Sequence, residues 1–243
     1  MLELLPVHAV HVDLVATDDA DAHQLRERYL MLLSPDEHAR MARLVFERDR
    51  RRFLLTRALV RTMLSRYAAV APQDWAFMAN VHGRPELLDR PGGAPDLRFN
   101  ISHTEGLIAC AVTIGREVGV DVEHVGRRLT RDVPARFFAP REVADLNAVP
   151  EPERHRVFFD YWTLKEAYIK ARGFGLALPL ADFAFRLSPP APPAISFEPA
   201  LPDDPATWQF AQDWPTPVHR LGLAVRRTGP DLAIRIRQVV PRV

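Results

Sequence analysis

The chain has 243 residues, which is enough for one large domain or two small ones. Apolar residues make up 47% and charged residues 26%, as in ordinary globular proteins, and the formal net charge of +1 gives no overall attraction to nucleic acid or to a membrane surface. The single cysteine, Cys110, excludes an intramolecular disulfide and is expected to be a buried small side chain. We predict a cytoplasmic protein, because no signal-peptide pattern and no membrane-spanning apolar run are present.

The first part of the chain is predicted to form one strand followed by three helices. Val7–Leu14 alternates as a strand does, and Asp21–Leu33 has the pattern of a short helix. The run Ser34-Pro35-Asp36-Glu37 offers an N-cap, a first-turn proline and a capping-box glutamate, so a second helix begins there. The strongest helical pattern covers Glu47–Ala69.

Strands are predicted around the middle of the chain. A Pro/Gly-rich loop at Arg90–Pro95 separates the first two, and a turn at Gly115 joins the last two. The four candidates are Asp74–Asn80, Leu97–Ser102, Leu107–Thr113 and Glu117–Val125.

Helices return over Thr130–Val149 and Glu151–Arg172, and Pro152 is well placed to start the second. The proline-rich segment Ser188–Pro205 is expected to be an irregular connector. Three strands close the chain, at Trp208–Trp214, Arg220–Arg227 and Asp231–Val239.

Strands, helices and strands therefore occur twice in succession. This order predicts an α+β fold of two similar units, residues 1–114 and residues 115–243, although no residue-level repeat is present.

Two carboxylates lie close together on one predicted strand, in Gly119-Val120-Asp121-Val122-Glu123. Residues at i and i+2 of a strand point to the same face, so Asp121 and Glu123 are neighbours. Taken alone, the pair is either a solvated polar face or a pair of ligands, and hard oxygen ligands in this arrangement suit Mg²⁺.

Glu166 lies on a predicted helix with Trp162 and Lys170 one turn to either side. One interpretation is an ordinary Glu–Lys surface pair. The helix is apolar on most of its faces, however, and a buried charge needs a partner. A metal ion held by Asp121, Glu123 and Glu166 would supply one, so we predict that these three carboxylates form a metal site.

Lys165 and Lys170 are the only lysines, and all other basic residues apart from histidine are arginines. An ammonium is a compact charge whose pKa shifts on burial, whereas a guanidinium stays protonated. Phosphate binding and proton transfer are the tasks for which this difference matters most. We therefore look for function around residues 162–170.

Three further features could bind phosphate, and each has a structural alternative. Ser102 and His103 lie where a predicted strand ends, and there they hold either a phosphate or a turn. The run His82-Gly83-Arg84-Pro85 is a turn from which Arg84 could reach an anion. Arg50, Arg57 and Arg61 share one helix face, which is either solvated or binds a phosphorylated nucleotide.

Taken together, these motifs resemble those of the 4′-phosphopantetheinyl transferases. Residues 119–123 and 162–170, about forty residues apart, are similar to the family's paired motifs. Asn100–Thr104 and Gly83–Pro85 match its upstream motifs in the same order, and Arg52–Leu64 resembles its N-terminal helix. The likeness covers residues 46–187, and the chain length resembles that of the longer, surfactin-type branch.

The resemblance implies two α+β halves related by a pseudo-twofold axis, with the active site between them. It implies Mg²⁺-dependent transfer of phosphopantetheine from coenzyme A to a serine of an apo carrier protein, with release of adenosine 3′,5′-bisphosphate. Acyl, polyketide and peptidyl carriers all fit, as in secondary-metabolite biosynthesis. The expected enzyme is a monomer that binds neither nucleic acid nor membrane, and the segment Gly126–Pro150 is a candidate carrier-docking surface.

The resemblance also implies a role for each matching residue. Asp121, Glu123 and Glu166 would bind Mg²⁺ against the coenzyme A pyrophosphate. Ser102 and His103 would contact its phosphates, and Arg84 its adenylate end. Lys165 and Lys170 would neutralise phosphate charge, with Lys170 assisting the leaving group. Two assignments stay open: the base is Glu166 or a metal-bound water, and the 3′-phosphate ligand is one of Arg48, Arg52, Arg57 and Arg61.

Two rival functions use similar residues. A Mg²⁺-dependent nuclease or nucleotide hydrolase also combines acidic pairs with a lysine, but the near-zero net charge argues against a nucleic-acid substrate. A carrier-binding module that has lost catalysis would not be expected to keep the three carboxylates and both lysines.

Overall fold

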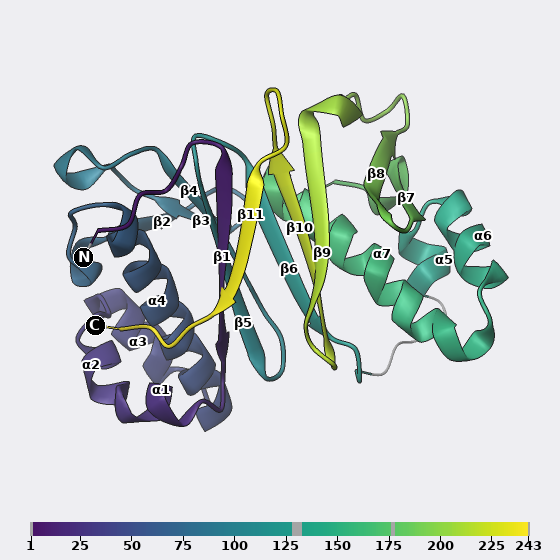
Figure 1. The fold of residues 1–243 in the computed structure, drawn as a ribbon. Helices are drawn as coiled ribbons and strands as arrows, with labels where there is room; N and C mark the ends of the chain where they lie inside the picture. The colour runs from purple at the N-terminus through teal and green to yellow at the C-terminus, as the bar shows by residue number, and fades with distance from the viewer. Residues whose placement is uncertain (1, 128–132, 176–177, 243) are drawn as a thin grey trace. The chain divides into compact units, whose positions relative to one another are not determined.

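The computed structural model describes residues 2–127, 133–175 and 178–242 (Figure 1). Contacts divide the chain into two compact units. The first consists of Met1–Val81, Pro85–Gly115 and Leu232–Val243, and the second of His82–Arg84 and Arg116–Asp231. Each unit has its own sheet and its own apolar core, so the predicted α+β class is confirmed.

The first unit contains a four-stranded sheet in the order β11-β1-β5-β4. β1 runs parallel to β11 and antiparallel to β5, and β5 is antiparallel to β4. The strands are β1 (Ala9–Ala16), β4 (Leu97–His103), β5 (Leu107–Ile114) and β11 (Ala233–Gln238).

The C-terminal strand β11 lies in the first unit, whereas the sequence placed it in the half formed by residues 115–243. A buried charge fixes this pairing. Asp13 on β1 has a fully buried side chain that forms ion pairs with Arg66 and, at 2.8 Å, with Arg237 on β11. Such a long-range partner cannot be read from the local sequence pattern.

The long helix α4 (Glu47–Tyr67) packs against this sheet with its apolar face and forms the centre of the first core. α3 (Pro35–Ala42) begins as predicted, because Ser34 and Glu37 make both hydrogen bonds of a capping box. The single helix expected over Asp21–Leu33 is instead two short ones, α1 (Ala20–Gln24) and α2 (Arg26–Leu30), which meet at the non-helical residue Leu25.

A small hairpin completes the first unit. β2 (Phe77–Ala79) pairs with β3 (Pro85–Leu87), and β3 was not predicted from the sequence. Cys110 on β5 is fully buried, as expected, and burial raises the pKa of its thiol.

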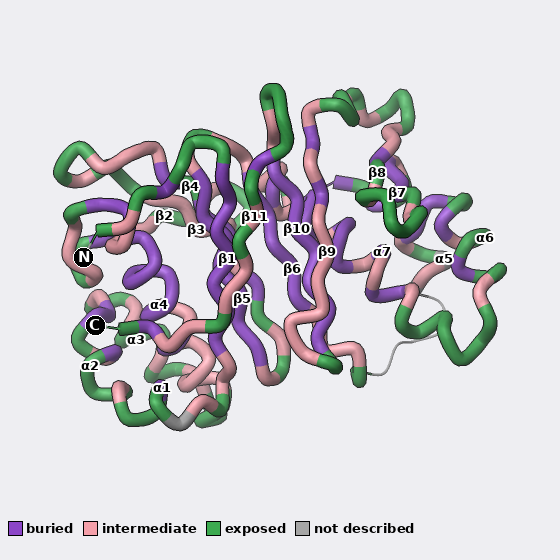
Figure 2. Tube along the Cα trace, viewed as in Figure 1, coloured by how far each residue is buried: buried purple, intermediate pink, exposed green. Residues whose placement is uncertain are grey.

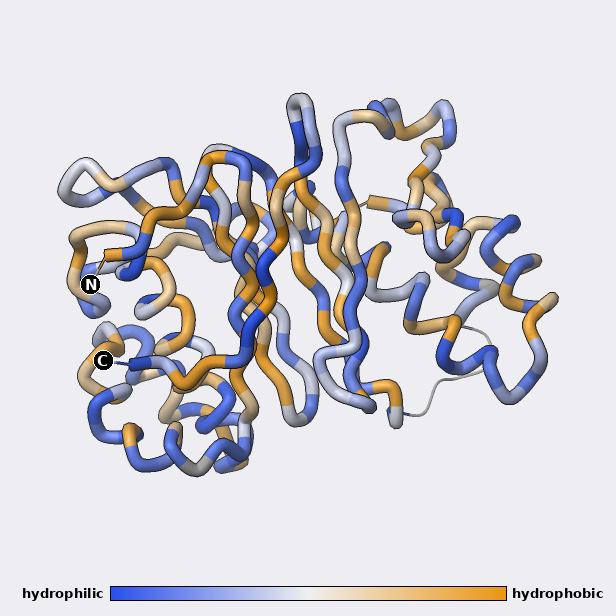
Figure 3. Tube along the Cα trace, viewed as in Figure 1, coloured by the Kyte–Doolittle hydropathy of each residue, from blue (hydrophilic) through white to orange (hydrophobic). Residues whose placement is uncertain are grey.

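The second unit contains a three-stranded antiparallel sheet in the order β6-β10-β9. The strands are β6 (Val118–His124), β9 (Trp208–Thr216) and β10 (His219–Arg226). α7 (Glu151–Arg172) lies across β6 and β10, with the bounds that the sequence predicts. Figure 2 shows that α7 and the neighbouring strands β6 and β10 contain many buried residues, and Figure 3 shows that many residues of these strands are apolar.

Two parts of the second unit differ from the prediction. The helix expected over Thr130–Val149 is divided into α5 (Val133–Phe137) and α6 (Pro140–Ala148), with residues 130–132 outside the described ranges. The irregular connector expected at Ser188–Pro205 is wrong over its first part, because β8 (Ala191–Phe197) pairs with β7 (Phe183–Ser188). Pro192 and Pro193 of β8 lie where its pairing register with β7 shifts, and a strand tolerates proline at such an irregularity. Among the described residues, no helix has the length and apolar character of a membrane span.

Candidate active site

Two glycines let α7 approach the sheet closely. A β-carbon at Gly119 on β6 would overlap the backbone of Ala167 and Ala171, and one at Gly222 on β10 would overlap the backbone of Thr163. The helix backbone therefore lies directly on the strands. This contact sets how near the carboxylates of β6 come to the side chains of α7.

Gly119→Ala is expected to push α7 away from β6 and to separate Glu166 from Asp121. Overpacking of this kind costs about 1–3 kcal/mol, and catalytic activity should fall more steeply than stability. Thermal unfolding and initial rates would measure the two effects. A wild-type catalytic rate in Gly119→Ala would contradict the role given to this contact.

Asp121 and Lys170 form a close ion pair between β6 and α7. The Lys170 Nζ lies 2.6 Å from Asp121 Oδ1, and the Asp121 side chain is almost fully buried. The Lys170 side chain is about a quarter exposed. The structure thus brings together two residues that the sequence predicted to share a site.

Glu123 and Glu166 belong to the same electrostatic cluster. Glu123 accepts a hydrogen bond from Trp162 Nε1 at 3.1 Å and pairs with Arg127, also at 3.1 Å. Burial and the neighbouring Asp121 raise its pKa. Burial also raises the pKa of Glu166 to about 7, with further contributions from Asp121 and Glu123. The three carboxylates are therefore close enough to repel one another.

The three carboxylates fit a magnesium ion in their chemistry. All their donors are oxygens, and a cation among them would relieve the repulsion that raises two of their pKa values. Within residues 2–127, 133–175 and 178–242, however, no group of three His, Cys, Asp or Glu side chains is arranged to hold a metal. The three-ligand site stays a prediction.

Lys165 has a structural place that the sequence did not predict. Its side chain is fully buried, and its Nζ contacts Glu142 Oε2 at 2.8 Å and the carbonyls of Leu180 and Phe183 at 2.7 Å each. Burial lowers its pKa to about 8, and Glu142 opposes this shift. To contact a phosphate, Lys165 would have to give up three partners, so the geometry argues against the predicted contact.

Glu142 is the residue of this cluster that sequence reasoning missed. It is fully buried on α6 and also accepts hydrogen bonds from the backbone N–H groups of Ala139 and Phe185. Pro140 marks the start of a helix and puts Glu142 at the capping-box position, which is a usable signal. Nothing in the sequence pairs it with Lys165.

Arg84 contacts the end of α7. Its guanidinium donates to the carbonyls of Lys170 at 2.9 Å, Ala171 at 2.8 Å and Val118 at 3.3 Å, which places it on the last turn of the helix and the first residue of β6. Its predicted contact with the adenylate end stays a prediction.

Arg57 and Arg61, which were predicted to face a ligand, both form ion pairs with Glu37. Arg61 is buried, pairs with Glu37 at 2.7 Å and donates to the Trp75 carbonyl at 2.6 Å. Arg57 pairs with Glu37 at 3.2 Å, and burial lowers its pKa. The structure gives Arg61 a structural role that argues against the predicted ligand contact.

The remaining predicted residues lie in the first unit. Ser102 and His103 are the last two residues of β4, with Ser102 buried and His103 exposed, so the strand runs one residue further than predicted. Their contact with phosphate stays a prediction. Of the other two candidate arginines, Arg52 pairs with Asp49 at 2.9 Å and Arg48 lies over the ring of Phe46.

Comparisons with known proteins agree with the motifs. Residues 117–219 match the 4′-phosphopantetheinyl transferase superfamily, and residues 21–114 match the N-terminal region of 4′-phosphopantetheinyl transferases. Among solved structures, the holo-[acyl-carrier-protein] synthases of Thermotoga maritima and Neisseria meningitidis align with TM-scores of 0.38 each, at 21% and 16% identity. Each alignment covers 46% of this chain, with 64% and 98% of the respective structures.

Characterised relatives are more similar in sequence. The chain is 39% identical to the 4′-phosphopantetheinyl transferase HetI of Nostoc over 71% of its own length and 75% of that protein. It is 34% identical to the 4′-phosphopantetheinyl transferase Sfp of Bacillus subtilis over 66% of its length and 69% of that protein. The chain therefore belongs to the 4′-phosphopantetheinyl transferase family and is a transferase enzyme.

Proposed function

We propose that the chain transfers the phosphopantetheine group of coenzyme A to a serine of an apo carrier protein in a Mg²⁺-dependent reaction that releases adenosine 3′,5′-bisphosphate. Family membership supports the reaction class. The observation that carries the proposal is the cluster of Asp121, Glu123, Glu166 and Lys170, in which a buried carboxylate of β6 contacts a partly exposed lysine of α7.

In the proposed reaction, Asp121, Glu123 and Glu166 would hold Mg²⁺, which supplies charge stabilisation at the phosphate oxygens when bound. Binding the ion requires Lys170 to share Asp121 with it or to turn away. Released from Asp121, the ammonium could donate to a phosphate oxygen or to the departing bisphosphate, where negative charge accumulates. No covalent enzyme intermediate is needed, since the nucleophile comes from the carrier serine.

The pKa of Glu166 bears on the choice of base. A carboxyl group that titrates at about 7 is suited to accept a proton near neutral pH. A bound Mg²⁺ would lower this pKa, so the value applies to the metal-free enzyme, and the base is either Glu166 or a metal-bound water. The same carboxylate is a proposed metal ligand, so both assignments are kept.

The substrate carrier is proposed to be an acyl, polyketide or peptidyl carrier domain, as in secondary-metabolite biosynthesis. The proposed enzyme is a cytoplasmic monomer that binds neither nucleic acid nor membrane. The net charge of +1 supports the proposal that the enzyme does not bind nucleic acid, because nucleic-acid-binding surfaces are strongly basic.

Product analysis distinguishes this proposal from hydrolysis. With coenzyme A, Mg²⁺ and an apo carrier, we expect adenosine 3′,5′-bisphosphate to appear in equal amount to the modified carrier, measured by liquid chromatography. Omission of the carrier should stop its release. Bisphosphate release without a carrier, or release of nucleotides from DNA, would favour a nucleotide hydrolase or nuclease instead.

A further inference from the structure

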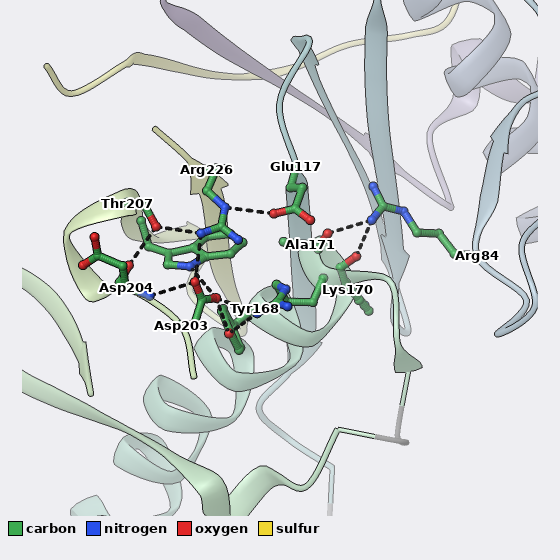
Figure 4. Close-up of polar contacts among 11 residues, drawn as sticks. Arg84, Glu117, Tyr168, Lys170, Ala171, Asp203, Asp204, Thr207 and Arg226 are labelled. Carbon is green, nitrogen blue, oxygen red and sulfur yellow. Dashed lines mark hydrogen bonds and ion pairs between the residues drawn. The ribbon is translucent and has the colours of Figure 1, made fainter. Parts of the chain in front are cut away.

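The last turn of α7 is anchored by a carboxylate outside the sequence motifs (Figure 4). Asp203, in the segment between β8 and β9, accepts hydrogen bonds from Tyr168 Oη at 2.8 Å and from Arg172 at 2.5 Å. Both donors lie on α7. The Asp203 side chain is nearly buried, so these contacts are shielded from water.

Asp203 is held in turn by the sheet of the second unit. Its Oδ2 also accepts from Trp208 Nε1 at 3.0 Å, and its Oδ1 accepts from Arg226 at 2.9 Å. Arg226 pairs with Glu117, directly before β6, at 2.9 Å. Asp203 therefore connects α7 with one end of the sheet that carries the proposed metal ligands, where β9 begins, β10 ends and β6 begins. Burial alone would raise the pKa of Asp203, but the hydrogen bonds it accepts hold the pKa below its usual value.

The backbone of the same turn has a second anchor. Arg84 donates to the carbonyls of Lys170 and Ala171 and to that of Val118, the first residue of β6 (Figure 4 shows the two helix contacts). Arg84 thus fixes the helix end along its axis, while Asp203 holds it from one side.

Helix geometry links these anchors to the proposed site. Tyr168 and Arg172 are four residues apart and share one face of α7. Glu166 and Lys170 are also four residues apart, and they lie about 200° around the axis from the first pair. Hydrogen bonds to Asp203 on one face of the helix end prevent rotation about the helix axis. The side chains on the opposite face therefore keep a fixed direction.

We propose that Asp203 is a positioning residue. By holding Tyr168 and Arg172 it fixes the rotation of the last turn of α7, and this aims Lys170 and Glu166 at Asp121. Neither Asp203 nor Arg226 touches these three residues in the contacts described above. The inference rests on the proposed function, because Asp203 is proposed to act through Asp121, Glu123, Glu166 and Lys170, the cluster that the proposed reaction uses.

Asp203→Asn tests the inference, because it removes the charge that Arg172 and Arg226 share and keeps the side-chain volume. Asp231→Asn is the matched control, since Asp231 also pairs with an arginine, Arg227 at 2.9 Å, but is mostly exposed and outside this network. The measurements are the melting temperature, the dissociation constant for Mn²⁺ by electron paramagnetic resonance without substrates, and kcat and KM for coenzyme A.

We expect Asp203→Asn to weaken Mn²⁺ binding and to lower kcat by about 10–100-fold each, as is typical for residues that orient metal ligands. Asp231→Asn should stay within about twofold of the wild type. Should Asp203→Asn fail to fold, Arg172→Gln removes one anchoring donor and should weaken Mn²⁺ binding in the same direction, with Arg172→Lys recovering part of the loss.

A purely structural role has a different signature. Asp203→Asn with a lowered melting temperature but wild-type Mn²⁺ affinity and kcat would overturn the inference and leave the proposed function intact. A wild-type protein that neither binds Mn²⁺ nor modifies a carrier would overturn the proposed function, and this inference with it.

Discussion

Replacing Glu166 by glutamine is expected to abolish transfer while the fold survives. The substitution keeps the side-chain volume and removes one of the three charges proposed to hold Mg²⁺. Loss of one group that stabilises charge in a transition state, such as an oxyanion-hole donor, typically lowers kcat by about 10²–10³-fold, and we expect at least that effect here. Asp121→Asn should behave in the same way. Initial rates of carrier modification measure both, and a near-normal rate in either variant would remove the metal site.

Although it should lose activity, Glu166→Gln should be more stable than the wild type when no divalent ion is present. The folded-state pKa of Glu166 is about 7, against an ordinary value of 4.5, so the fold favours the protonated form. The wild type therefore loses stability as the pH rises from 4.5 to 7, and the loss is complete above 7. Glutamine does not ionise, so Glu166→Gln should be more stable than the wild type at pH 8 by roughly 1–3 kcal/mol, with partial exposure taken into account.

Chemical denaturation at pH 5 and pH 8 with a chelator measures this difference. Glu153→Gln, on the exposed first turn of the same helix, is the control and should show no pH-dependent gain. Added Mg²⁺ should stabilise the wild type at pH 8 but leave Glu166→Gln unchanged, because a ligand stabilises only a fold that binds it. A wild type whose stability does not fall between pH 5 and 8 would contradict the electrostatic account.

Breaking the buried pair of Lys165 and Glu142 is expected to destabilise the second unit strongly. Both side chains have no exposed surface, so removing one partner leaves an uncompensated charge in the core of the second unit. Such changes cost about 3–5 kcal/mol. We therefore expect Lys165→Met and Glu142→Gln each to lower the free energy of unfolding by this amount, measured by denaturant titration.

The double variant Lys165→Met/Glu142→Gln separates a structural role from a phosphate contact. Glutamine can keep only one of the hydrogen bonds from Ala139 and Phe185, because Glu142 accepts them with different oxygens, but neither charge is then left alone in the core. We expect the double variant to recover part of the stability and to modify the carrier at a rate within about tenfold of the wild type. A double variant that is stable but inactive would return Lys165 to the phosphate-binding role inferred from sequence.

Local patterns explain which elements could be predicted. α7 has the predicted bounds because Pro152 lies in its first turn and Gly173, with a φ of 72°, ends it. The capping box of α3 is likewise encoded in four successive residues. β8 was missed because prolines mask a strand that is irregular at those positions. The pairing of β11 with β1 depends on Asp13 and Arg237, which are 224 residues apart.

In the candidate site too, local sequence predicts some features, and contacts with distant residues decide the others. The proximity of Asp121 and Lys170 followed from the two motifs, because each motif lies on a predicted element, but the ion pair between them was not predicted. The positions of Lys165 and Arg61 did not follow, since each is buried by a partner from elsewhere in its unit, Glu142 and Glu37 respectively. Periodicity gives the face of a helix, but it does not say what covers that face. Asp203 belongs to no motif at all.

The most direct test of the proposed function is the intact mass of an apo carrier protein incubated with the chain, coenzyme A and Mg²⁺. A panel of acyl, polyketide and peptidyl carriers also shows which class is preferred. We predict that at least one carrier gains the mass of one phosphopantetheine group, and that Glu166→Gln gives no gain. An unchanged mass for every carrier in the panel would contradict the proposed function.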